Sequence, residues 1–201
     1  MISDKPLVFV PTYNERENVQ NLVSEILALG LDLDLLLMDD NSPDGTGRII
    51  DELALKYPNI KTVHRSGKLG VGSAHYDGIG WAYEHGYSRL ITMDCDFTHP
   101  PRYIKEILAG AGDAAVKVGS RYMQGGSLAG WNLFRTFLTK TGHFLTETLL
   151  GMEYDATGGF RFYRLDVIPR YVFSLVRSKG YSFFFESLYV IHRNGFKIKE
   201  I

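Results

Sequence analysis

Two aspartates separated by one residue, Asp94 and Asp96, end a short apolar run in the middle of the chain. The run, residues 90–93, has strand length and strand-type residues, so the pair is expected at the carboxyl end of a β-strand. Because side chains alternate along a strand, both carboxylates should point one way and Cys95 back toward the core. Carboxylates suit Mg²⁺ or Mn²⁺, which complete their shells with water and substrate phosphates. The spacing predicts a two-carboxylate metal site; the alternative is a pair of solvated turn residues.

The segment after this pair is expected to open a helix. Thr98 or His99 could cap it, and Pro100 or Pro101 fits its first turn, where no amide donor is needed. In open α/β sheets, ligands bind at the carboxyl ends of the strands, which is where the pair would lie.

Two further predicted strands also end in polar residues. Residues 11–15 follow the first strand and residues 39–42 the second. Parallel strands place their carboxyl ends at one edge, so these clusters should meet the metal pair in one cleft, with Arg65 and Lys68 arriving from a glycine-rich loop. Each cluster alone could be a helix cap or a turn. Together they favour a nucleotide site, with the base against aromatic and apolar atoms, a carboxylate on the ribose or base, and the diphosphate reached through the metal.

Alternating strands and helices position these clusters. The periodicity predicts a first helix from Asn14 or Glu15 to Gly30, and a short later helix that begins at Asp166. Strand–helix alternation implies right-handed crossovers and a mainly parallel sheet, an α/β fold. The last predicted strand reaches the end of the chain, which suggests a fragment of a longer domain. Strands are expected at residues 7–10, 33–38, 60–63, 90–93, 114–118, 158–163 and 197–201. The remaining helices are expected at residues 73–85, 131–150 and 183–193, with one more that has residues 49, 50, 53 and 54 on its inner face and stops near Pro58.

The amino-acid composition limits the classes of protein to which this chain can belong. A chain of 201 residues with 45% hydrophobic and 22% charged residues is typical of one folded domain. The net charge of -1 gives no bulk attraction to nucleic acid. A single cysteine excludes an internal disulfide and favours a reducing, cytoplasmic compartment. No apolar run approaches the roughly 18 residues that a membrane span needs.

Two features have competing interpretations. The amphipathic stretch 131–150 could pack on the sheet or on a second copy of the chain, as in a homodimer, or lie on a membrane surface. His75, in the helix after the glycine-rich loop, could act as a base, but a solvated helix histidine is the favoured interpretation.

Seven motifs, in order along the chain, resemble the dolichol-phosphate mannosyltransferase group. This group belongs to the inverting glycosyltransferases of the second sequence family and has the GT-A fold, a three-layer α/β/α arrangement. The resemblance implies one catalytic domain over residues 1–201, with a nucleotide-binding half, 1–101, and an acceptor half, 102–201. Members continue with a further strand and a basic motif that this chain lacks. The motifs are PTYNERENV, DDNSPDGT, GKLGVGSA, MDCDFTHPP, GSRYMQGG, the stretch from Trp131 to Arg135, and DATGGFR.

The resemblance also assigns roles to residues. Asp94 and Asp96 match the metal ligands, and Thr98 stands where some members have a glutamine in the metal shell. Arg121 and Arg135 match arginines that face the diphosphate and the acceptor phosphate. The nucleotide pocket would be lined by Pro11, Tyr13, Glu15 and Asp40, supported by Asp39 and with Lys68 nearby.

The implied reaction moves mannose from GDP-mannose to a polyprenyl or dolichyl phosphate at the cytoplasmic face of a membrane, with Mg²⁺ or Mn²⁺. Relatives use a UDP-sugar of the glucose type, so that donor stays open. The acceptor phosphate is already an anion, so no general base is expected among the clustered aspartates, and one in-line displacement inverts the anomeric carbon. Metal and arginines would stabilise the charge on the leaving diphosphate.

Other classes fit less well. The pattern Asp94-x-Asp96-x-Thr98 matches the nucleophile motif of haloacid-dehalogenase phosphatases, but there it follows the first strand. A Rossmann dehydrogenase is disfavoured, because the glycines of residues 67–72 lack the GxGxxG spacing. A non-catalytic module that binds a sugar nucleotide is the remaining alternative.

Overall fold

The computed structural model describes residues 4–110, 112–119 and 150–201. Its strands form a single sheet in the order β3-β2-β1-β4-β6-β5-β7. Strands β1 to β4 are parallel to one another, whereas β6 is antiparallel to both β4 and β5. The strands are β1 (Leu7–Thr12), β2 (Asp34–Asp39), β3 (Ile60–His64), β4 (Arg89–Thr92), β5 (Val116–Val118), β6 (Arg161–Arg164) and β7 (Ile198–Glu200).

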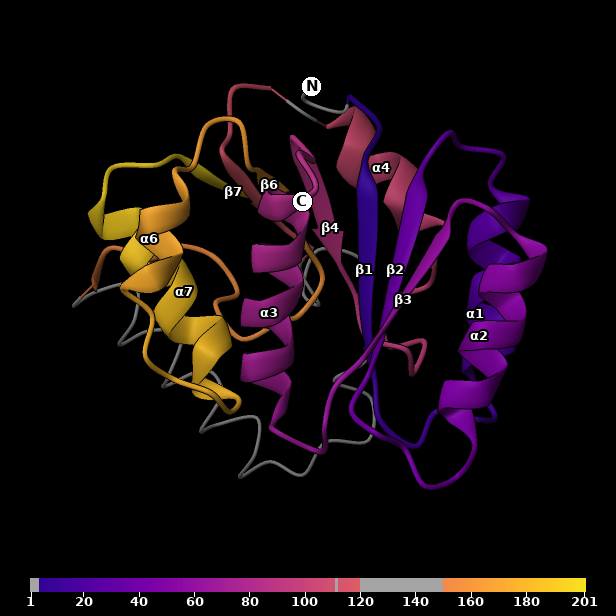
Figure 1. Cartoon of the computed structure of the whole chain (residues 1–201). Helices are drawn as coiled ribbons and strands as arrows, with labels where there is room; N and C mark the ends of the chain where they lie inside the picture. Colours follow the sequence, from indigo (N-terminus) through magenta and orange to yellow (C-terminus); the bar gives the residue numbers. More distant parts are fainter. Residues whose placement is uncertain (1–3, 111, 120–149) are drawn as a thin grey trace, which may run out of the picture.

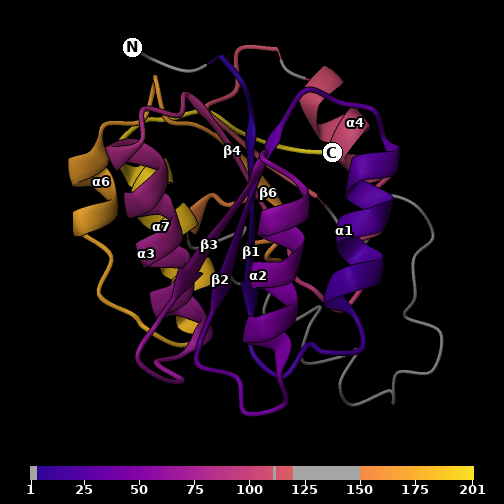
Figure 2. The same ribbon diagram turned by 45° about the vertical axis from the view of Figure 1, so that its right-hand side comes forward.

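Helices cover both faces of this sheet, so the predicted three-layer α/β class is confirmed. Figures 1 and 2 show α3, α6 and α7 on one side of the sheet and α1 and α4 on the other. The helices are α1 (Val19–Ala28), α2 (Thr46–Lys56), α3 (Val71–Glu84), α4 (Tyr103–Ala109), α6 (Arg170–Ser174) and α7 (Ser182–Arg193).

The central strands are apolar on both faces, as strands between two helical layers must be. Leu7 and Phe9 of β1 pack into the core beneath α3 and α7, while Val8 and Val10 pack into the core beneath α1 and α2. All four side chains are fully buried. This alternation holds β1 rigidly, so the polar residues that follow it leave the sheet at a defined place.

The first helix begins at Val19, not at Asn14 or Glu15 as predicted. Residues 14–16 donate their amide hydrogens to side chains of the loop after β2 and of the first residue of α2, so the segment is already bonded before the helix starts. Asn14 also has a positive φ of 60°, which a helix does not accommodate. The three bonds run to Ser42 Oγ (2.9 Å), Thr46 Oγ1 (2.9 Å) and Asp44 Oδ2 (3.1 Å).

Two other predicted helix starts are wrong. Neither Thr98 nor His99 caps a helix, because α4 begins only at Tyr103, after the two prolines. Likewise α6 begins at Arg170 behind Pro169, and Asp166 instead lies in a turn, where it forms an ion pair with Arg164. The remaining predicted helices and strands occur close to their expected positions, except residues 131–150, of which only Leu150 is described.

Among the described residues, no helix combines the length and the apolar character needed to cross a bilayer.

Candidate functional site

A pocket of about 590 Å³ lies where β1, β2 and β4 end, facing the N-terminus of α3. These three strands are neighbours in the sheet and run the same way, so their polar ends meet at one edge. The structure therefore brings together most of the residues that the sequence singled out. Pro11, Tyr13, Glu15, Asp40, Lys68, Asp94 and Asp96 all line this pocket.

The two adjacent aspartates after β2 have different positions. Asp40 lines the pocket, whereas Asp39 lies behind it and is 1% exposed. Asp39 accepts hydrogen bonds from the Ser42 amide (2.9 Å), the Ser42 hydroxyl (2.5 Å) and Thr12 Oγ1 (3.1 Å). It therefore holds the turn after β2 against β1. The role in nucleotide binding that the resemblance implies for Asp39 stays a prediction.

Asp40 is fixed in the pocket wall by Arg65. The Arg65 Nη1 atom lies 2.7 Å from Asp40 Oδ1, and these side chains are 6% and 7% exposed. The Leu69 amide donates to Asp40 Oδ2 at 3.2 Å, and Arg65 Nε lies 3.2 Å from Asp77 Oδ2. Arg65 thus faces Asp40 from behind and does not line the pocket.

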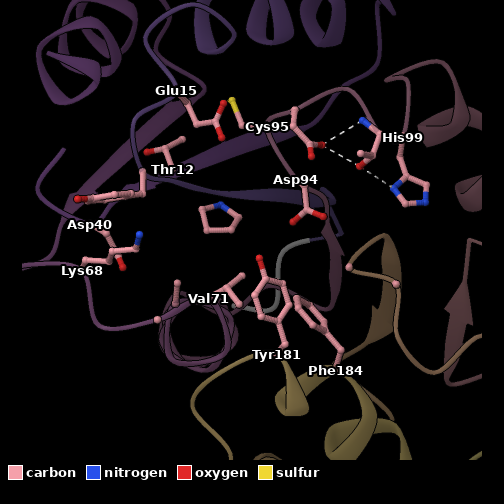
Figure 3. Close-up of a pocket in the computed structure, with 18 of the residues that line it drawn as sticks. Thr12, Glu15, Asp40, Lys68, Val71, Asp94, Cys95, His99, Tyr181 and Phe184 are labelled. Carbon is pink, nitrogen blue, oxygen red and sulfur yellow. Dashed lines mark hydrogen bonds between the residues drawn. The ribbon is translucent and has the colours of Figure 1, made fainter. Parts of the chain in front are cut away.

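Tyr13 and Lys68 form the adjoining wall. The Lys68 ammonium lies 4.2 Å from the centre of the Tyr13 ring, a cation–π distance. In Figure 3 the Lys68 and Asp40 side chains lie together at one side of the pocket, across from Asp94. This side offers an aromatic face, an ammonium and a carboxylate, which are groups that bind a nucleoside.

Asp94 is half-buried and points into the pocket (Figure 3). Gly159 lies against it, because a Cβ at that position would be 3.0 Å from Asp94 Oδ2. Thr92 Oγ1 donates to the Gly159 carbonyl at 2.6 Å. The turn before β6 is therefore tied to β4 and lies against the Asp94 carboxylate.

Asp96 is exposed at the rim of the pocket, and Thr98 orients it. The Thr98 amide and hydroxyl both donate to Asp96 Oδ1, at 3.0 and 2.8 Å. Thr98 thus closes a tight turn on the predicted metal ligand instead of capping a helix.

The donor chemistry of this pocket fits a hard divalent cation. Among the described residues there is no group of three or more His, Cys, Asp or Glu that could hold a metal ion. Two carboxylates beside an open pocket are nonetheless what Mg²⁺ or Mn²⁺ needs when phosphates and water supply the other ligands. Cys95 does not add to them, because burial, and then the charges of Glu15, Asp96 and Asp94, raise the pKa of its thiol.

Several pocket residues have no role in the sequence-based prediction. Tyr181 and Phe184 approach from α7 and the segment before it, and in Figure 3 Tyr181 points toward the same space as Asp94. Thr157 and Gly158 add a wall from the turn before β6. The glycine pair in the DATGGFR motif was the available signal, since paired glycines permit a close approach of backbone to a site.

His75 contradicts the prediction of a solvated histidine. It is 1% exposed and packs against the rings of Phe9, Phe183 and Phe184. Burial, and then the charge of Arg161, lower its pKa to about 3. The periodicity of α3 could not show this, because α7, which covers His75, lies about a hundred residues further along the chain.

Arg121 and Arg135, the two predicted phosphate contacts, lie outside the described residues.

Comparison with known proteins places the chain in a family. The model described as "Glycosyl transferase family 2" matches residues 7–172. The chain belongs to this family. Its resemblance to the second sequence family of glycosyltransferases is therefore confirmed.

Two curated relatives of this family 2 glycosyltransferase match nearly all of it. One, from Mycolicibacterium smegmatis, is named polyprenol monophosphomannose synthase; it is 39% identical over 99% of this chain and 76% of its own length. The other, from Micrococcus luteus, is named undecaprenyl-phosphate mannosyltransferase; it is 33% identical over 97% of this chain and 81% of its own length.

Solved structures support the GT-A fold of this family 2 chain. S. aureus TarS 1-349 has a TM-score of 0.64 at 17% identity, and covers 98% of this chain and 58% of its own. Mannosyltransferase PcManGT from Pyrobaculum calidifontis was solved with GDP-Man and Mn²⁺, and its TM-score is 0.61 at 14% identity. The match covers 98% of this chain and 54% of PcManGT. The chain spans little more than half of either structure, and at these identities the likeness concerns the fold.

Proposed function

We propose that this chain transfers mannose from GDP-mannose to a polyprenyl phosphate, with inversion and with a divalent metal ion. The observation that carries the proposal is the pocket in which a nucleoside side and a two-carboxylate side face each other across one cavity. The names of the two similar curated proteins support mannose as the sugar and a polyprenyl phosphate as the acceptor.

Different pocket residues would bind different parts of the sugar-nucleotide donor. Tyr13, Asp40 and Lys68 would bind the nucleoside, with Asp39 fixing the turn beneath them. Asp94 and Asp96 would hold Mg²⁺ or Mn²⁺. When bound, that ion would neutralise charge on the diphosphate as the sugar leaves.

The acceptor needs no general base, because a polyprenyl phosphate is an anion at neutral pH. One phosphate oxygen forms a bond to the anomeric carbon, the carbon–oxygen bond to the diphosphate breaks, and its electron pair stays on GDP. Arg121 and Arg135 stay predicted contacts of the two phosphates. Because the lipid tail of the acceptor lies in a bilayer, we expect the chain to work at a membrane surface, on its cytoplasmic face. A homodimer through residues 131–150 stays a prediction.

A UDP-sugar is the second candidate donor. It is favoured by the likeness in fold to S. aureus TarS, which has been solved in complex with UDP-GlcNAc.

Radiolabelled transfer tests the proposal. The chain is incubated with undecaprenyl phosphate in detergent and with GDP-[¹⁴C]mannose or UDP-[¹⁴C]glucose, with Mn²⁺, Mg²⁺ or EDTA. We expect label in the lipid from GDP-mannose only, and only with a divalent ion. Asp94→Asn should lower this transfer by roughly a hundredfold, because removing a metal ligand removes the electrostatic stabilisation of the leaving group.

The matched control is Asp113→Asn, which changes an exposed aspartate that pairs with Lys197 away from the pocket. It should keep full activity. If label reached the lipid only from UDP-glucose, the donor would be a UDP-sugar and not GDP-mannose. If the chain bound nucleotide but transferred no label, it would be a binding module. Full activity of Asp94→Asn in EDTA would overturn the metal site.

A further inference from the structure

Arg161, in β6, is a fully buried arginine directly behind the pocket. A guanidinium has five N–H donors, and here all five are used. Within the described chain they reach three main-chain carbonyls and two hydroxyls, and no carboxylate. The acceptors are the carbonyls of Gly158 (2.8 Å), Ala156 (3.0 Å) and Phe184 (2.8 Å), and the hydroxyls of Ser187 (3.0 Å) and Tyr163 (3.3 Å).

These bonds join two separate walls of the pocket. The carbonyls of residues 156 and 158 belong to the turn whose next residue, Gly159, lies against Asp94. The carbonyl of Phe184 belongs to α7, and the Phe184 side chain lines the pocket. Arg161 therefore sets the distance between the turn and the helix.

The energetics of burial indicate that this link has a purpose beyond stability. Removing an ion from water costs several kcal/mol, and apolar replacements of buried ions are often equally stable or more so. What arginine supplies and an apolar residue does not is a rigid fork of directed donors. Four of its five donors bond to the turn at residues 156–158 and to α7, and the fifth bonds to Tyr163 on the same strand.

We propose that Arg161 is a positioning residue of the transfer site, which holds the turn 156–159 against Asp94 and so fixes the orientation of the metal-binding carboxylate. The inference rests on the proposed function, because the end of the pocket that Arg161 supports is the end assigned to metal and diphosphate. It acts through hydrogen-bond geometry, so a lysine, which keeps the charge but not the fork, does not replace it.

The readout is the metal-linked gain in nucleotide affinity, the ratio of the Kd of GDP in EDTA to its Kd in Mn²⁺, measured by calorimetry. In Arg161→Lys and Arg161→Met we expect this ratio to fall by roughly 10- to 100-fold, the range typical when residues that orient metal ligands are changed. The Kd in EDTA should change less than about twofold, because Tyr13, Asp40 and Lys68 lie on the β1–β2 side of the pocket. If Arg161 only stabilised the fold, its replacement would change the Kd of GDP in EDTA and the Kd in Mn²⁺ by the same factor.

Arg164→Met is the matched control, since Arg164 lies on the same strand but is 37% exposed and pairs with Asp166. It should leave the ratio unchanged. A normal ratio in folded Arg161→Lys or Arg161→Met would overturn the proposal. If neither variant folds, the test is made with Ser187→Ala, which removes one of the five acceptors of Arg161. A ratio of the two Kd values lowered by about threefold supports the positioning role, and an unchanged ratio overturns it.

Two further measurements separate this inference from the proposed function. UDP is titrated in parallel, so that a metal-linked gain with UDP and not GDP would change the donor while still testing Arg161. Hydrogen exchange needs no ligand: faster exchange in residues 155–160 and 182–187, with β1 and β2 unchanged, supports the positioning role even if no nucleotide binds. Unchanged exchange in those two segments overturns it.

Discussion

The side of the pocket for which we propose nucleoside binding contains a buried ion pair between Asp40 and Arg65. Asp40→Asn leaves the Arg65 guanidinium buried without its main counter-charge. We expect the free energy of unfolding to fall by about 3 kcal/mol, because removing one partner of a buried pair leaves an uncompensated charge. The Kd of GDP should rise at least about tenfold, since a polar wall of the pocket is lost. Urea unfolding and calorimetry measure the two effects.

Asp77→Asn is the control for this change, because Asp77 also pairs with Arg65 but is 49% exposed and does not line the pocket. Its cost should stay below about 1 kcal/mol, as for exposed ion pairs. If Asp40→Asn and Asp77→Asn lowered the free energy of unfolding equally, Asp40 would not be the main counter-charge of Arg65.

At the residue scale, the sequence predicted types and spacing better than it predicted burial. Asp94 and Asp96 line the pocket and Cys95 is buried in the core, because alternation along a strand is a local rule. Which aspartate of the 39–40 pair lines the cavity, and that His75 is buried, depend on partners far along the chain. Arg161 ends the DATGGFR motif but received no role of its own, because nothing local distinguishes a buried arginine from an exposed one.

At the scale of elements, helix α3 meets the segment before α7 where both reach the pocket. A Cβ on Gly72 would lie 2.4 Å from the Gly180 carbonyl oxygen and 2.5 Å from Phe183 Cβ, closer than any real contact. Gly72→Ala should therefore force the helix and the segment apart. We expect the free energy of unfolding to fall by about 1–3 kcal/mol, as for overpacked cores, and nucleotide binding to weaken.

Gly80→Ala in the same helix is the matched control. Its Cβ would lie 3.6 Å from Arg170 Nη2, an ordinary contact. The substitution should raise the free energy of unfolding by roughly 0.5–1 kcal/mol, because alanine is the better helix former. Thermal or urea unfolding followed by circular dichroism compares the two, and equal stability of Gly72→Ala and the parent would show that the helix has room to shift.

Most elements were predictable because apolar runs and helical periodicity are local signals. The errors fall at the starts of α1, α4 and α6, where contacts from elsewhere or prolines decide. Residues 14–16, for example, look ready to start a helix but bond to the loop after β2. Such long-range bonds have no signature in the segment itself.

At the scale of the whole molecule, parallel pairing of β1 to β4 followed from the strand–helix alternation. The insertion of antiparallel β6 between β4 and β5 did not, because strand partners depend on the entire sheet. That insertion is what brings Gly159 against Asp94 and places Arg161 behind the same turn. The half of the site supplied by β1, β2 and β4 was therefore predictable, and the half supplied by β6 and α7 was not.

His75 should make the stability of the whole fold depend on pH. Its pKa is about 3 when folded, through burial and then the charge of Arg161, and 6.5 in the unfolded reference. Between these values the unfolded chain binds one more proton, so stability falls as pH falls below 6.5. At pH 5 the loss from this group is about 2 kcal/mol, since one pKa unit is worth about 1.4 kcal/mol.

His75→Leu, which keeps an apolar side chain among Phe9, Phe183 and Phe184, isolates this effect. Other groups titrate in both proteins, so the informative quantity is the difference in unfolding free energy between variant and parent, from urea curves at pH 8, 6.5 and 5. At pH 8 the His75 imidazole is neutral in both the folded and the unfolded protein, so the difference reports packing alone. On acidification it should shift by about 2 kcal/mol in favour of the variant. A difference independent of pH would mean that the protein accommodates a protonated His75, and that the interior beside Arg161 is open to water.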